Sequence, residues 1–99
     1  MGTVKQEPVE FRIHGPRPPC AVEFDPEWRA VYLRLREGAV SRSEEIADGV
    51  VLDRGQGDVI LGIEIVGLGV ERCASVLRDL REAYLAEAPE LGAVEVVAA

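Results

Sequence analysis

Five acidic side chains in the middle of the chain have the chemistry that catalysis or metal binding requires: Glu44, Glu45, Asp48, Asp53 and Glu64. Carboxylate oxygens are the ligands that calcium and magnesium prefer. A carboxyl group in an apolar cleft acquires a raised pKa that suits acid–base chemistry. Glu64 stands between two isoleucines, so on a strand it points away from both. Two interpretations stay open: a structural carboxylate, exposed or paired with Arg34 or Arg36 on a neighbouring strand, which we favour, and a functional acid in a cleft.

The rest of the sequence has no stronger pattern for a catalytic or metal-binding site. The stretch EEIADG lacks the alternating oxygen ligands of a calcium loop and is typical of a solvated edge. His14 is the only histidine, and Cys20 and Cys73 are 53 positions apart, which does not suit zinc and favours two ordinary thiols. We therefore predict no catalytic, cofactor-binding or metal-binding residues and no cofactor. The alternative is a small metal-dependent enzyme that uses Glu64 and nearby acids.

Composition limits the class of protein. Ninety-nine residues, 47% of them hydrophobic, suffice for one domain over residues 1–99. The net charge of −7 argues against a nucleic-acid partner, which needs a basic surface, and suits a basic protein partner. No apolar stretch approaches the roughly 20 residues of a membrane span. The N-terminal MGTVKQEPVE lacks a signal-peptide core, so we expect a cytoplasmic protein with no membrane partner.

Alternation of apolar and polar residues predicts a series of short strands. The clearest is AVYLRLREG, where Val31, Leu33 and Leu35 share one face and Tyr32 lies on the other. Further strands are expected at 9–13, near 22–24, and within 40–47, 50–53 and 59–67, with 40–47 at an edge because of its charges. Glycine turns separate them, and no long crossover intervenes. The pattern predicts an antiparallel meander sheet of about 4–6 strands, with residues 22–67 as its core.

The period changes after residue 69. Apolar residues recur at helical spacing from Cys73 to Tyr84, and Pro89 must end the helix, which we place at residues 70–87. A final short strand is expected in VEVV, residues 94–97. One sheet face covered by one amphipathic helix defines an α+β domain.

Residues 24–66 resemble a known family. The segments FDPEWRAVYLRLREG, EEIADGVVLD and VILGIEIVG are similar to a small bacterial family, domain of unknown function 2283, with its Asp-Pro-Glu segment, Ala-Leu-Tyr-Ile strand and Gly-Ile-Glu-Ile strand. The resemblance covers somewhat under half of the chain and implies a small antiparallel sheet. It implies no activity. Some members are encoded beside small toxin-like proteins, which implies an antitoxin-like or binding role by analogy.

The chain departs from the family pattern at two positions. Arg29 replaces an acid that the family commonly carries, and Trp28 replaces a small residue. For Trp28 we weigh a role in capping the core, which we favour, against a role in anchoring a partner.

We expect a non-enzymatic protein-interaction module that self-associates as a dimer, or, as the alternative, binds a basic toxin-like protein. The candidate interface residues are Trp28, Tyr32, Glu64 and Val66.

Overall fold

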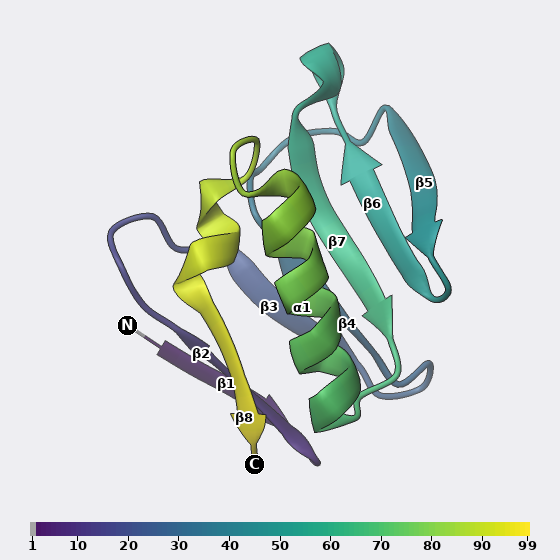
Figure 1. Cartoon of the computed structure of the whole chain (residues 1–99). Helices are drawn as coiled ribbons and strands as arrows, with labels where there is room; N and C mark the ends of the chain where they lie inside the picture. Colours follow the sequence, from purple (N-terminus) through teal and green to yellow (C-terminus); the bar gives the residue numbers. More distant parts are fainter. Residues whose placement is uncertain (1) are drawn as a thin grey trace.

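Two antiparallel sheets and one helix make up the fold (Figure 1). The structure is a computed structural model that describes residues 2–99. The smaller sheet has the order β1-β2-β8, formed by β1 (Gly2–Gln6), β2 (Val9–Ile13) and β8 (Val94–Ala98). The larger sheet has the order β3-β4-β7-β6-β5, formed by β3 (Ala21–Asp25), β4 (Ala30–Arg34), β5 (Arg42–Ala47), β6 (Val50–Arg54) and β7 (Ile60–Val66).

The five-stranded sheet has one buried face because its strands alternate. Val31 and Leu33 of β4 are fully buried and lie opposite Ile65 and Ile63 of β7. Val50 and Leu52 of β6 extend the same rows. Burying such aliphatic side chains stabilises the fold by about 1.5–3 kcal/mol each. We call this the inner face and the opposite one the outer face.

The helix α1 (Val70–Tyr84) lies over the inner face and beside β8 (Figure 1). Its buried residues are Cys73, Leu77 and Leu80. The guanidinium of Arg81 donates hydrogen bonds to the carbonyl oxygens of Leu91 and Val94, which ties α1 to the short 3-10 helix η2 (Pro89–Ala93) and to β8. A second 3-10 turn, η1 (Gln56–Asp58), joins β6 to β7.

The smaller sheet completes the core from the other side. Val9, Phe11 and Val94 are buried, and the ring of Phe11 packs edge-on against Phe24 with centroids 5.8 Å apart. Edge-to-face contacts of this kind add to the apolar burial. No helix within residues 2–99 is long and apolar enough to cross a membrane.

The predicted α+β class, with antiparallel sheets and a helix near the C-terminus, is confirmed. The helix ends at Tyr84 rather than at the predicted residue 87, and a turn then leads to Pro89. Consecutive strands β5, β6 and β7 form the expected meander, but β4 pairs with β7 rather than with β5. The strand expected at 94–97 is β8, and it joins the smaller sheet, where β1 had not been predicted.

Candidate functional site

Three of the four candidate interface residues lie on the outer face of the five-stranded sheet. Tyr32 is directly opposite Glu64, and Glu64 is opposite Val51 of β6, so these side chains form one row across the sheet. Val66 lies opposite Ala30, at the end of β4 that adjoins the β3–β4 turn. Val66 is 41% exposed, whereas Tyr32 and Glu64 are half-buried. The sheet register therefore pairs positions that are up to 36 residues apart in the sequence.

Tyr32 lies flat across Gly62, the glycine of the family's Gly-Ile-Glu-Ile strand. Gly62 is opposite Arg34 in the register, and a Cβ atom added to it would overlap the phenol ring and hydroxyl of Tyr32. The ring can cross β7 only because this position has no side chain. Glycine here is thus a packing requirement of the outer face.

Crossing Gly62 brings the Tyr32 hydroxyl to Asp53 on the next strand. The hydroxyl donates a hydrogen bond of 2.9 Å to Oδ2 of Asp53, and Ser43 Oγ donates one of 2.6 Å to Oδ1. Three strands, β4, β6 and β5, are thereby joined by side chains. On the other side of the ring, the Arg34 guanidinium lies 5.2 Å from the ring centroid and pairs with Glu23 at 2.8 Å. The Tyr32 hydroxyl and the Arg34 guanidinium are therefore both engaged in contacts within the sheet.

The phenol of Tyr32 should titrate far above an ordinary tyrosine. Burial raises its pKa to about 12, and the hydrogen bond to the Asp53 carboxylate adds to the effect. Because the folded-state pKa is raised, its contribution to stability is complete below the unfolded pKa of about 10 and is lost as the pH rises through 12. An ultraviolet absorbance titration, with Tyr32→Phe as the blank, should show this phenol ionising late. Asp53→Asn should lower its pKa, and an unchanged value would contradict the assigned cause.

Glu64 has a different environment from the one predicted. Its neighbour across β4 is Tyr32, not an arginine, because Arg34 is opposite Gly62 and pairs with Glu23. Arg36 is the ion-pair partner of Glu90 instead. The predicted pairing of Glu64 with Arg34 or Arg36 is therefore wrong. Glu64 is a half-buried carboxylate between an aromatic ring and Val51, in an open row of side chains rather than in a cleft.

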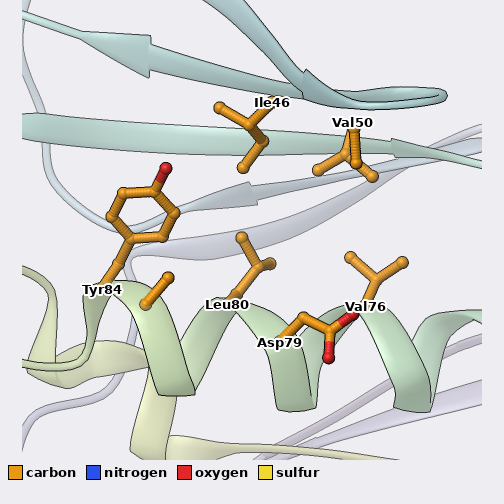
Figure 2. A pocket seen from close by; sticks show the side chains of 8 residues that line it. Ile46, Val50, Val76, Asp79, Leu80 and Tyr84 are labelled. Carbon is orange, nitrogen blue, oxygen red and sulfur yellow. The ribbon is translucent and has the colours of Figure 1, made fainter.

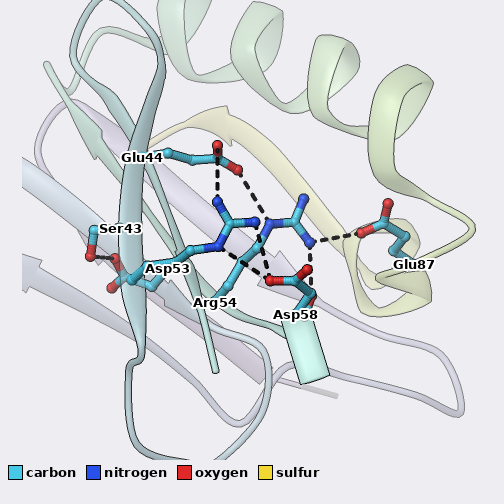
Figure 3. A network of polar contacts seen from close by, with 7 residues as sticks. Ser43, Glu44, Asp53, Arg54, Asp58 and Glu87 are labelled. Carbon is cyan, nitrogen blue, oxygen red and sulfur yellow. Dashed lines mark hydrogen bonds and ion pairs between the residues drawn. The ribbon is translucent and has the colours of Figure 1, made fainter. Parts of the chain in front are cut away.

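The remaining acids do not gather around Glu64. Glu44 is opposite the buried Leu52, on the inner face, where Arg54 links it to Glu87 through ion pairs of 3.2 and 3.1 Å (Figure 3). Asp48 lies in the β5–β6 turn. No group of three or more His, Cys, Asp or Glu side chains in the part of the chain described here could hold a metal ion. Cys20 is exposed, Cys73 is buried, and both are free thiols.

Trp28 is one of the most exposed apolar side chains of the described chain, at 70%. The favoured interpretation, that it caps the core, is wrong. The turn that carries it is held by Asp25, whose Oδ1 accepts hydrogen bonds from the backbone N–H groups of Glu27 and Trp28 at 3.1 and 3.3 Å. The turn then closes with Arg29 at a positive φ of 49° and a hydrogen bond from Gly67 N to Arg29 O. The indole is therefore largely exposed to solvent.

The sequence patterns did not indicate Ser43, Asp53 and Gly62 as parts of this surface. Asp53 had been grouped with an acidic edge, and Gly62 was only part of a motif. Their role depends on β6 and β4 both being neighbours of β7, which places Gly62 between Arg34 and Asp53. The glycine in an otherwise apolar strand was the one available signal, since such glycines often mark close approach of another group.

Comparison with known proteins gives one family. Residues 21–68 match the model of the family described as "Protein of unknown function (DUF2283)", which spans β3 to β7 and all of the outer face. Neither a curated protein nor a solved structure matches the chain. The matched segment contains the Tyr32–Gly62 packing and all four candidate interface residues. The resemblance of residues 24–66 to the strands of this family is therefore confirmed.

Proposed function

We propose that this protein is a non-enzymatic protein-interaction module that self-associates through the outer face of its five-stranded sheet. The observation that carries the proposal is the placement of exposed apolar side chains at that face. Val66 and Val40 are 41% and 51% exposed, and Trp28, at 70%, lies in the adjoining turn. Val40 lines a shallow pocket together with Tyr32, Arg34 and Asp53. The buried core of an interface is more apolar than the rest of the protein surface and is enriched in aromatic residues such as tryptophan and tyrosine.

Rigidity supports the same proposal. The Tyr32 ring is fixed by Gly62 beneath it and Asp53 at its hydroxyl, so binding would not have to order this side chain. Binding free energy is lost whenever side chains must be immobilised, and a preordered aromatic group avoids that cost. The proposal includes a bacterial cytoplasmic location, where the two free cysteines stay reduced.

Charge gives the self-association a defined salt response. The outer face carries one guanidinium, Arg34, and a larger set of carboxylates: Glu23, Glu45, Asp53 and Glu64. Two such faces repel each other electrostatically, and salt screens the repulsion over about 8–10 Å at physiological ionic strength. Apolar burial must therefore provide the attraction, and a dimer formed this way should become more stable as salt is added.

Light scattering across a range of protein concentration tests the proposal. The native chain should approach twice its monomer mass of 10.8 kDa as concentration and salt rise. Val66→Glu should weaken the dimer by at least about ten-fold, because it adds a buried charge to the contact. Val59→Glu is the matched control, since Val59 is 38% exposed but lies next to η1, away from this face. A strict monomer at every concentration, or equal effects of the two substitutions, would overturn the proposal.

The carboxylates of the outer face favour a second candidate, a basic protein partner such as a toxin-like chain. Here the negative face would attract its partner, so binding should weaken as salt increases. The opposite sign of the salt response separates the two candidates. If light scattering shows only a monomer, self-association is excluded, and binding of a basic partner becomes the proposed function of this face.

A further inference from the structure

We propose that the edge of β5 and the cleft between β5 and α1 form a second binding site, one that takes an extended segment with an apolar residue between basic residues. The segment would add a strand beside β5 and place its apolar side chain in the cleft. This site shares only Glu45 with the outer face and does not depend on the self-association proposed above.

The first observation is the open edge of the larger sheet. β5 is the last strand in the order and pairs only with β6, so one side of its backbone has no partner strand within residues 2–99. Unpaired N–H and C=O groups along such an edge are a template for strand addition. β5 is also polar and has an irregular register between Glu45 and Ala47, both of which oppose indiscriminate pairing.

The second observation is an apolar cleft directly behind this edge. Ile46 and Val50 of the hairpin face Val76, Leu80 and Tyr84 of α1 across the cleft (Figure 2). Its volume is about 260 Å³, sufficient for one branched aliphatic side chain. Ile46, Val76 and Tyr84 are only partly buried, so the layer between sheet and helix is incomplete on this side. An inward-facing side chain of an added strand would continue that layer.

The third observation is the charge around the cleft, which selects the partner. Glu45 and Asp48 are exposed on the hairpin, and Asp79, with a side chain 69% exposed, lines the cleft on α1. Of the basic groups nearby, Arg72 is occupied by the carbonyl oxygens of Val66 and Asp48, and Arg78 contacts Asp79 at 3.8 Å. The acids therefore outnumber the available cations, which favours lysine or arginine in the added strand.

A second copy of this chain does not fit the edge. If two copies paired antiparallel about a two-fold axis at the centre of β5, either Glu44 or Glu45 would stand opposite the same residue of the other copy. Like charges directly opposite each other on neighbouring strands are destabilising. The occupant is therefore another chain of basic character. Its residues alternate, with the apolar one pointing into the cleft and the basic ones pointing to the side of Glu45.

The probe is the peptide Lys-Thr-Lys-Ile-Lys-Thr-Lys, titrated into the native chain and followed by backbone amide NMR shifts. The expected result is saturable binding with the largest shifts in residues 42–47 and on the helix face that carries Ala83. Replacing the peptide's isoleucine by serine keeps its charge and should weaken binding about ten-fold, because the cleft contact is lost. A peptide with glutamate in place of every lysine should not bind.

Matched substitutions on α1 locate the site. Ala83→Arg fills the cleft and should weaken peptide binding at least about ten-fold, whereas Ala74→Arg, also exposed on α1 but outside the cleft, should leave it within about two-fold. Equal binding of the isoleucine and serine peptides, equal effects of the two arginines, or shifts centred on Tyr32 and Val66 would overturn the proposal. Val66→Glu should still bind the peptide, so failure of the outer-face dimer is distinguishable from failure of this site. A dimer mass lost in Ala83→Arg would show that a second copy occupies the cleft and would also overturn it.

Discussion

Gly62→Ala is expected to lower the free energy of unfolding by about 2 kcal/mol, as overpacking of a well-filled site does. The added methyl group would occupy the place of the Tyr32 ring and hydroxyl, so the ring must leave β7. Its hydrogen bond to Asp53 would be lost with it. Equilibrium unfolding in urea, with far-ultraviolet circular dichroism as the signal, measures the loss.

The same substitution should change sign when Tyr32 is absent. In a Tyr32→Ala background the space above Gly62 is empty, and alanine is favoured over glycine in a strand by about 0.5–1 kcal/mol. Gly62→Ala should therefore stabilise that variant slightly, and the double-mutant cycle should show strong coupling between the two positions. Additive effects would mean that the glycine has a role other than admitting the ring.

Arg36→Ala is expected to cost about 3 kcal/mol of stability, because it removes one partner of a buried ion pair. The Glu90 side chain is only 9% exposed, and Arg36 donates hydrogen bonds to both of its carboxylate oxygens at 3.0 and 3.3 Å. A further bond from Arg36 reaches the carbonyl oxygen of Glu87 at 2.9 Å. Without the guanidinium, a buried carboxylate would be left uncompensated where η2 meets the end of β4.

The pH dependence of that loss has a definite sign. Burial alone would raise the pKa of Glu90, but the hydrogen bonds from Arg36 and from its own backbone lower the pKa below its usual value. The pair therefore contributes stability above the ordinary carboxyl pKa of about 4.3, and this is lost as the pH falls through the lower folded-state value. The gap between native chain and Arg36→Ala should be widest near neutral pH and should narrow below about pH 4.

The exposed pair of Arg34 and Glu23 provides the control for this prediction. Its side chains are 37% and 51% exposed, so Arg34→Ala should cost much less stability than Arg36→Ala. Equal losses for Arg34→Ala and Arg36→Ala would show that burial does not determine the strength of these pairs.

Local pattern was enough to predict most of the elements. The alternation of Val31, Leu33 and Leu35 marked β4, and Gly49 with a φ of 71° closes the hairpin that the Asp48-Gly49 pair predicted. The helix began where its period began, at residue 70, but it ended at Tyr84 rather than at 87. Residues 85–87 form a turn instead, in which the carbonyl oxygen of Tyr84 accepts hydrogen bonds from the backbone N–H groups of both Glu87 and Ala88.

The environment of each site residue could not be predicted in the same way, because it depends on strand order. A meander would have placed β5 beside β4, whereas the observed order places β7 there. Because of that order, Glu64 lies opposite Tyr32 in the register, and Arg34 forms its ion pair with Glu23. The exposure of Trp28 could not be predicted from the sequence pattern either. Hydrogen bonds to Asp25 hold the turn, so the turn forms without burial of the indole.

The fluorescence of Trp28 tests the central proposal most directly, because it is the only tryptophan in the chain and adjoins the outer face. The indole is 70% exposed in the single chain. If the outer face mediates self-association, raising the protein concentration should shift the emission to shorter wavelength and reduce quenching by acrylamide, and Val66→Glu should abolish both changes. An emission spectrum and quenching constant that stay the same, while light scattering shows a dimer, would place the interface elsewhere and contradict the proposal.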